Sequence, residues 1–519
     1  MQRKLFPFLM VLTAALACNL TRDPVPPTPI PPTLTPDQTA TALAVLPTAT
    51  ATSLPSPTLP PSNTPTPTST LTPTITPTPL PSSTPLATVA YAGDNRASKA
   101  VPNALIDGLD RAWLSFTVSN SQSSPEEGTA QPEESTQSVY LIRPDTGERV
   151  EIVTLPQSTG DRIYWSPTGM HLVYFIDPAE GAGGLYLLDL QRGREIRLFE
   201  ADNLQPRGII GHAPQWSPDG TRLALALPTA YATDIFLLNA DGTGFENLTD
   251  SPSYDFWPAW SPDGTTLAFV SDRVECPTWI PGTPGTCDKP DATAPSTGNL
   301  FTYDLESGQV RKITDRVLNS PPRWINNNML SVSMGSLDPL ASVSELWVYD
   351  VAAGSSWQVS PADGALYSAP AWTNDGERLV YQRIGQGASS IILADRFGSV
   401  LASIDEYIFV RYGLSISWAP DGDFVALAGS NGQCPYGIIV LTGRFQRVTD
   451  PATNLLACDV VYSPEGSYLA YEGIRVARGT DGRLDVYIAN TNGLGARAAT
   501  ANLEGTFNIL GWVGPTFRE

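Results

Sequence analysis

Short apolar runs recur along the chain after residue 95, and a polar turn precedes each of them. The run RLALAL at 222–227 and the run TLAFV at 266–270 both follow the residues Trp-Ser-Pro-Asp-Gly. Because apolar residues occupy both alternating sides of these runs, they predict strands that are covered on both faces of a sheet. In the turn, Pro presets φ and Gly accepts a positive φ, so a tight turn is expected before each strand.

The turn and its strand belong to a repeat of roughly 45 to 50 residues, with one longer interval. Each unit continues with a third strand, such as LYLLD at 185–189, and a fourth, amphipathic strand, such as VRKIT at 310–314. Four short strands at this period predict the blade of a β-propeller, in which the aromatic residue fills the gap between neighbouring blades. The aromatic positions are Trp165, Trp216, Trp260, Trp324, Trp372, Trp418 and Tyr462.

The two ends of this region predict a shared blade. Residues 111–119, 138–147 and 148–153 have the pattern of second, third and fourth strands, but no first strand precedes them. The missing strand is expected at 506–514, and closing the ring in this way would leave no sheet edge between the termini. The sequence therefore predicts an all-β propeller of eight four-stranded blades over 96–519, with seven blades as the alternative if the first unit is only a flap.

The first 95 residues differ in composition from the remainder. Residues 18–95 consist mostly of Pro, Thr and Ser and cannot bury enough apolar surface to fold, so they predict a disordered stalk. Residues 1–17 combine a basic start with a short apolar run and predict a signal peptide. The ending Ala-Leu-Ala-Cys18 resembles the lipobox of bacterial lipoproteins, which implies lipidation of Cys18 and an extracytoplasmic place on the cell membrane or envelope. The alternative is a simple secretory signal cut after Ala17.

The turn motif with its following strand, Leu-Ala-Phe at 267–269, resembles the repeats of TolB-type β-propellers, a WD-like family. The resemblance extends over nearly all of the chain after residue 110. It departs most at 325–328, where Ile-Asn-Asn-Asn replaces the turn residues. The resemblance implies the propeller fold, and a role in the Tol system does not follow from it.

Four cysteines besides Cys18 can pair in three ways. The local pairing, Cys276 with Cys287 and Cys434 with Cys458, closes short loops and fits an oxidising compartment. A metal site is the alternative, but there is no Cys-x-x-Cys pair and the two histidines lie far from the cysteines in sequence. We therefore expect two disulfides and no metal.

Composition and motifs argue against several functional classes. The net charge of −21 disfavours nucleic acid as a partner, because phosphate binding needs a basic face. There is no Gly-x-Ser-x-Gly elbow and no glycine-rich phosphate loop. The sequence therefore predicts neither an enzyme nor a cofactor.

Binding is expected at the mouth of the central channel, on the loops that enter the inner strands. These loops mix aromatic residues with both charge signs, which suits a peptide or polar ligand. The disulfide-bearing insert 272–298 is a second candidate surface. The predicted mouth residues are Asp161, Arg162, His212, Tyr254, Asp255, Phe256, Tyr367, Arg411, Tyr412 and Asp459.

These features predict a monomeric binding or scaffold module for a protein or peptide of the envelope or exterior, attached to the membrane only by its lipid. One alternative is a carbohydrate-binding or carbohydrate-cleaving propeller, a lyase or hydrolase that uses carboxylates such as Asp255 and Asp459. The other alternative is an architectural envelope protein without a defined ligand.

Overall fold

A computed structural model of the chain provides the structure. The signal peptide, Cys18 and nearly all of the expected stalk lie outside the described residues. The described residues are 94–98, 109–120, 135–160, 162–177, 183–200, 213–287, 297–334, 344–385, 388–405, 413–449, 454–476 and 482–514.

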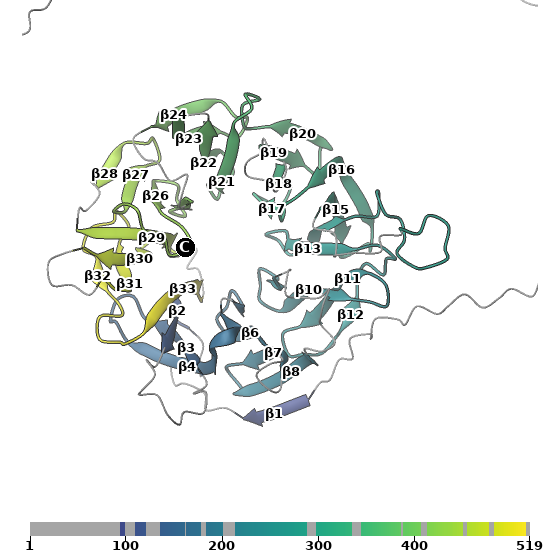
Figure 1. The fold of residues 1–519 in the computed structure, drawn as a ribbon, viewed down its shortest axis with the longest axis horizontal. Coiled ribbons are helices and arrows are strands. Elements are labelled where there is room, and N and C mark those ends of the chain that lie inside the picture. The colour runs from purple at the N-terminus through teal and green to yellow at the C-terminus, as the bar shows by residue number, and fades with distance from the viewer. Residues whose placement is uncertain are drawn as a thin grey trace, which may run out of the picture. The chain divides into compact units, whose positions relative to one another are not determined.

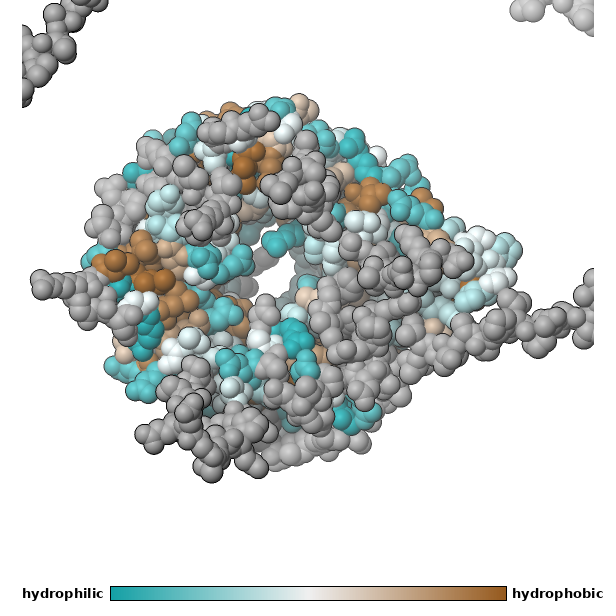
Figure 2. Space-filling model, viewed as in Figure 1, coloured by the Kyte–Doolittle hydropathy of each residue, from teal (hydrophilic) through white to brown (hydrophobic). Residues whose placement is uncertain are grey.

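Eight antiparallel sheets surround a central channel and form an eight-bladed propeller (Figure 1), which excludes the seven-bladed alternative. Figure 2 shows the opening of this channel in the space-filling view. The innermost strands carry the recurring aromatic residue at or near their ends. They are β5 (Ile163–Trp165), β9 (Gln215–Trp216), β13 (Asp255–Trp260), β17 (Arg323–Trp324), β21 (Leu366–Trp372), β25 (Ser415–Trp418), β29 (Leu455–Tyr462) and β33 (Thr506–Val513).

The second and third strands of each blade are its most buried parts, as their continuous apolar runs predict. The second strands are β6 (His171–Ile176), β10 (Arg222–Pro228), β14 (Thr266–Ser271), β18 (Met329–Met334), β22 (Arg378–Gly385), β26 (Phe424–Ala428), β30 (Tyr468–Arg475) and β2 (Trp113–Asn120). The third strands are β7 (Gly184–Asp189), β11 (Thr233–Asn239), β15 (Gly298–Asp304), β19 (Glu345–Asp350), β23 (Ala388–Asp395), β27 (Ile439–Thr442), β31 (Leu484–Asn490) and β3 (Thr136–Ile142).

The outer strands vary more in length, and one of them has an additional neighbour. They are β8 (Arg194–Glu200), β12 (Glu246–Asn247), β16 (Val310–Leu318), β20 (Ser355–Gln358), β24 (Val400–Ile404), β28 (Arg447–Thr449), β32 (Arg497–Ala498) and β4 (Arg149–Pro156). A fifth strand, β1 (Asp94–Ser98), pairs antiparallel with the outer edge of β8. The sequence did not predict β1. In the described part of the chain the single helix is the short 3-10 turn η1 (Gln157–Thr159), and no helix there is long and apolar enough to cross a membrane.

The ring closes as the sequence predicted. The C-terminal strand β33 is the inner strand of a blade whose other strands, β2, β3 and β4, come from the start of the propeller. The pairing of β33 with β2 is antiparallel and places Trp512 opposite Leu114. Both ends of the domain are thereby fixed in one sheet.

The core lies between neighbouring blades. One apolar cluster joins Ala224 of one blade, Phe269 and Leu300 of the next, and Leu330 of a third. Each of these four side chains has no measurable exposure to solvent. Burying a large apolar side chain in this way contributes about 1.5–3 kcal/mol.

The recurring tryptophan forms a hydrogen bond between blades as well as filling the gap between them. The indole Nε1 of Trp260 donates to the carbonyl oxygen of Gln215 at 3.0 Å, and that of Trp324 donates to the carbonyl of Ala259 at 2.9 Å. In each case the acceptor immediately precedes the aromatic residue of the preceding blade. The bond recurs from Trp216 to Tyr164, from Trp418 to Ala371 and from Trp512 to Val461.

The aspartate of the motif serves the turn. The hydroxyl of Ser217 donates to Asp219 at 2.6 Å, and Asp219 accepts the backbone N–H of Thr221 at 3.1 Å. Gly220 has φ of 69°, as this turn requires. In the divergent blade, Asn326 accepts the N–H groups of Asn328 and Met329, both at 2.9 Å, and so caps a turn of different sequence.

One indole in the series offers a natural control for the inter-blade bond. The buried Nε1 of Trp372 has no hydrogen-bond partner among the described residues, whereas Trp324 in the neighbouring blade is bonded. We expect Trp324→Phe to lower the free energy of unfolding by about 1 kcal/mol more than Trp372→Phe, because only the first leaves a carbonyl without its donor. Guanidinium unfolding of both variants measures the difference. Equal losses would show that the tryptophans act through packing alone.

A buried carboxylate links the last complete blade to the closing strand. Glu472 is 2% exposed, and it accepts the backbone N–H of Ile509 on β33 at 2.7 Å. The pKa of Glu472 is raised to about 7, mainly by burial; the Ile509 N–H lowers this pKa and the nearby charge of Asp459 raises it. The folded protein therefore keeps this proton to a higher pH than the unfolded chain does.

The sign of this linkage gives a pH prediction. Between about pH 4.5 and 7 the folded state binds more protons at Glu472 than the unfolded state, so stability falls as the pH rises. The change from this group is on the order of 3 kcal/mol. We expect the melting temperature of Glu472→Gln to fall less between pH 5 and pH 8 than that of the parent chain. Parallel melting curves for the two proteins would contradict this role.

Candidate binding site

The disulfide-bearing insert rises from the face where chains enter the inner strands. It lies between β14 and β15, as the sequence predicted, and residues 272–287 of it are described. Because strands alternate in direction, loops between second and third strands share a face with the loops that enter first strands. The structure pairs Cys276 with Cys287, and Cys434 with Cys458 on a second loop of this face. This is the local pairing that the sequence favoured.

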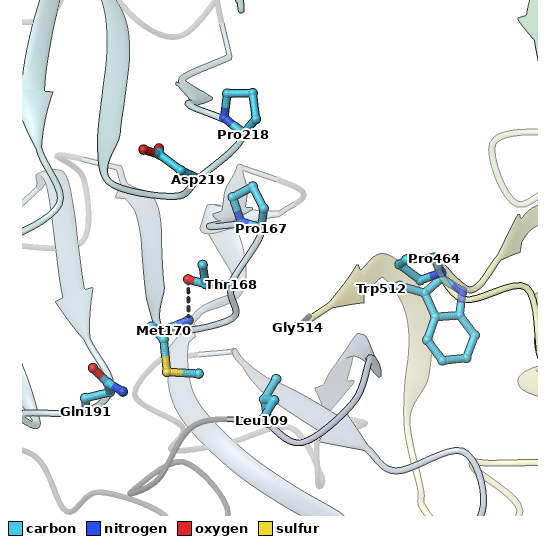
Figure 3. A pocket seen from close by; sticks show the side chains of 10 residues that line it. All are labelled: Leu109, Pro167, Thr168, Met170, Gln191, Pro218, Asp219, Pro464, Trp512 and Gly514. Atoms are coloured by element: carbon cyan, nitrogen blue, oxygen red, sulfur yellow. Dashed lines mark hydrogen bonds between the residues drawn. The ribbon is translucent and has the colours of Figure 1, made fainter. Parts of the chain in front are cut away.

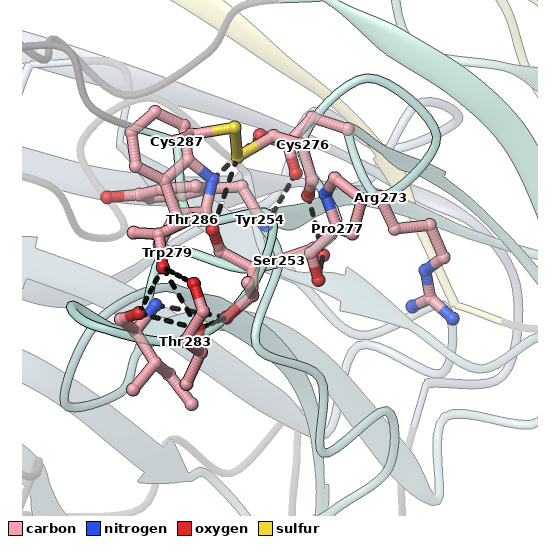
Figure 4. The surroundings of a disulfide bond; sticks show 12 residues. Ser253, Tyr254, Arg273, Cys276, Pro277, Trp279, Thr283, Thr286 and Cys287 are labelled. Atoms are coloured by element: carbon pink, nitrogen blue, oxygen red, sulfur yellow. Dashed lines mark hydrogen bonds between the residues drawn. A yellow bond between two sulfur atoms is a disulfide. The ribbon is translucent and has the colours of Figure 1, made fainter.

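Asp272 fixes the insert to the entry loop of β13. Its carboxylate accepts the backbone N–H of Tyr254 at 2.8 Å and the indole N–H of Trp279 at 2.9 Å. The Trp279 ring meets the Tyr254 ring edge-on at 5.2 Å. The hydroxyl of Ser253 donates to the carbonyl of Cys276 at 2.9 Å (Figure 4), so the insert is bound to its base on several sides.

Three buried aspartates lie near the base of the insert. Asp255 is fully buried and pairs with Arg273 at 2.7 Å, yet burial raises its pKa even though Arg273 lowers it. Burial likewise raises the pKa of Asp234 and of Asp272 to about 6, and the charge of Asp255 adds to both shifts. Asp234 accepts the Asn247 amide of β12 at 2.8 Å, and it accepts the backbone N–H of Ser251 at 2.9 Å, which holds the loop before β13. Through these hydrogen bonds and the ion pair, the buried carboxylates hold the insert and the neighbouring loop in place.

The structure places three of the predicted aromatic mouth residues inside the blades. Tyr254, Phe256 and Tyr367 are each no more than 2% exposed, because the inner strands extend through or next to these positions. The Tyr367 hydroxyl donates to Asp363 at 2.6 Å, and this bond holds the pKa of Asp363 at about 2. These side chains pack the ring rather than line its mouth, and their participation in binding stays a prediction.

The remaining predicted residues divide into two groups. Arg162 is partly exposed, with its guanidinium 4.6 Å from the centre of the Phe175 ring. Asp459 is also partly exposed and accepts the N–H groups of Asn431 and Gly432 at 2.9 and 2.7 Å, which orders the second disulfide loop. The other four lie outside the described residues: Asp161, His212, Arg411 and Tyr412.

One group of side chains has the spacing of metal ligands. Donor atoms of Cys458, Asp459 and Glu472 lie within 4.8 Å of one another. The sulfur of Cys458 is bonded to Cys434, and Glu472 accepts the N–H of Ile509. A disulfide sulfur offers no thiolate to a metal, so the chemistry of these three side chains does not fit a metal site.

A hollow that was not predicted from the sequence lies on the opposite face, among the turns that join first to second strands (Figure 3). Its volume is about 490 Å³, and prolines from three turns line it together with Met170 and Trp512. The prolines are Pro167, Pro218 and Pro464. The repeat itself contained the signal, since every such turn must lie on the same face of the ring.

A second hollow of about 450 Å³ adjoins the first and shares Thr168, Met170, Gln191 and Asp219 with it. His171 lines this second hollow, 5.8 Å from the centre of the Trp216 ring. Burial lowers the pKa of His171, and its Nδ1 has no partner within the described part of the chain. The turn face thus offers a partly apolar groove with a neutral imidazole.

Three solved structures are among those similar to this chain. The initiation-factor chain of "Crystal structure of the eukaryotic initiation factor" is 13% identical, with a TM-score of 0.50 over 78% of this chain and 99% of that one. A putative TolB from Agrobacterium tumefaciens is 15% identical over 57% of this chain and 90% of its own, with a TM-score of 0.30. An oligogalacturonate lyase from Vibrio parahaemolyticus is 15% identical over 68% of this chain and 96% of its own, with a TM-score of 0.41.

The family model of the TolB β-propeller domain matches residues 164–279, from β5 through β14 into the insert. This stretch contains three of the repeated tryptophans with their turns. Residues 164–279 therefore resemble the TolB β-propeller domain, and the eight sheets show the propeller architecture for the ring as a whole.

Proposed function

We propose that the propeller is a non-catalytic binding module, and that the face bearing the insert 272–287 receives a protein or peptide partner. The observation that carries this proposal is the insert itself. Asp272 at its base accepts hydrogen bonds from Tyr254 and Trp279, while Val274 is 46% and Ile280 is 36% exposed. A rigid projection with exposed apolar side chains is suited to the centre of a protein interface.

The carboxylates named for a carbohydrate-cleaving activity have other partners. A general acid or base must come within hydrogen-bond reach of the substrate. Asp255 is fully buried against Arg273, and Asp459 caps two backbone N–H groups. Their engagement supports binding over cleavage.

The proposal includes a location outside the cytoplasmic membrane, with Cys18 lipidated and residues 18–95 acting as a stalk. A stalk of this length could span on the order of 200 Å in the polyproline II conformation, and less as a coil. Such a tether would carry the propeller away from the membrane. The two disulfides support an oxidising compartment.

The binding face can be tested by affinity capture from envelope extract. We expect a chain with Val274→Asp and Ile280→Asp to retain at least tenfold less of a protein that the parent chain retains, because two charges would enter an apolar interface. Leu494→Asp is the matched control, since Leu494 is 54% exposed on the turn between β31 and β32, at the opposite face. Quantitative mass spectrometry of the retained proteins measures the ratio.

Two outcomes would contradict this location of the binding site. Equal capture by all three chains would remove the insert from the interface. Loss of capture in a chain with Gln191→Arg, in the hollow of the turn face, would place the partner there instead.

The anchor has its own test. We expect Cys18→Ser to transfer the protein from the detergent phase to the aqueous phase in a phase-partition assay, because the lipid supplies the apolar surface. Thr21→Ser should partition as the parent chain does. Detergent partition that persists in Cys18→Ser would contradict the lipid anchor.

A further inference from the structure

The rim of the propeller is formed by the outer edges of its blades. An open strand edge exposes unpaired N–H and C=O groups, and proteins protect such edges with charged residues, proline or a covering segment. Here β8 is covered by β1, β4 contains Arg149 and Glu151, and β16 contains several charged residues. Among the described outer strands of five or more residues, β24, with the sequence VLASI, has no charged residue, no proline and no covering strand from the described part of the chain.

The same strand exposes apolar side chains. Val400 and Leu401 are 53% and 55% exposed, and Phe397, in the turn that leads into β24, is 60% exposed. We call these three residues the β24 patch. Phe397 and Leu401 have the largest exposed fractions of the exposed large hydrophobic residues in the described chain. The Trp357 ring, 5.8 Å from the Phe397 ring, extends the apolar surface onto the neighbouring blade.

The structure contains a precedent for adding a strand to a blade. The pairing of β1 with β8 is antiparallel and turns a four-stranded blade into a five-stranded sheet. The outer edge of a blade in this ring is therefore open enough to accept a further strand. The edge of β24 has the same place in its own sheet, after β23.

We infer that β24 pairs with β24 of a second copy of this chain, antiparallel about a two-fold axis at Ala402. Such a contact is self-complementary, because each copy offers the same apolar strand. Val400 then lies opposite Ile404 of the partner subunit. Each copy carries a net charge of −21, so an edge without charged residues allows two copies to approach with the least repulsion.

The area buried in this contact is small, so the two copies bind weakly. Five residues on each side with the β24 patch bury less than the roughly 1,200 Å² of a stable interface. We therefore expect a reversible dimer with a dissociation constant above about 1 μM. This proposal replaces the monomer expected from the sequence, and it is independent of the partner proposed for the insert.

A cysteine at the two-fold axis tests the pairing in the full chain. Directly opposed residues of antiparallel strands lie about 4.5–5.5 Å apart at Cα, within the range of a disulfide. We expect Ala402→Cys to form a covalent dimer under mild oxidation, at least fivefold more than Val310→Cys. Val310→Cys is the matched control, because Val310 is 37% exposed on the charged outer strand β16.

A second substitution separates pairing from chance collision. Adding Leu401→Lys to Ala402→Cys should reduce cross-linking to the level of Val310→Cys, and the melting temperature checks that this exposed substitution leaves the fold intact. Non-reducing electrophoresis measures both results. Cross-linking equal to that of Val310→Cys, or unaffected by Leu401→Lys, would overturn the proposal. So would a covalent product containing a different protein.

Discussion

The packing of the recurring aromatic residue between neighbouring blades, with an indole hydrogen bond to the preceding blade at most positions, is the contact on which the ring depends. A blade alone is a four-stranded sheet with two apolar faces, and it becomes stable only when neighbours cover both. Trp260 and Trp324 fill the gap and also satisfy a backbone carbonyl there. Arg222 strengthens the contact, with its guanidinium 5.0 Å from the centre of the Trp260 ring, because a cation over an indole face is favourable.

This packing also determines where function can lie. The inner strands use their polar and aromatic side chains to hold blades together, so that Asp255 and Tyr367 are almost fully enclosed. The surfaces available to a partner therefore lie outside the packed inner strands. They are the insert on one face, the grooves among the turns on the other face, and the rim. Buried carboxylates such as Asp272 contribute by fixing these additions in place.

Ring closure and edge protection solve the same physical problem at two places. The pairing of β33 with β2 joins the ends of the propeller, and Glu472 bonds to that closing strand. On the outside, β1 covers the edge of β8. An open strand edge is a template for association, and β24 is the one without charged residues among the described outer strands of five or more residues.

The sequence by itself determined the blade and its four strands, and it favoured eight blades closed by both ends over seven, because apolar periodicity and turn chemistry are local properties. It also indicated the insert and the disulfide pairing, since the cysteines of each pair are near in sequence. Only the tertiary structure decided which side chains face outward. The inner strand β13 contains a bulge at Trp257, where φ is 53°, and β29 has one at Asp459, where φ is 50°. A bulge shifts the alternation of side chains between the two faces of a strand. A positive φ at a residue other than glycine is imposed by packing from neighbouring blades. The enclosed positions of Tyr254 and Asp255 could therefore not be predicted from the chain alone.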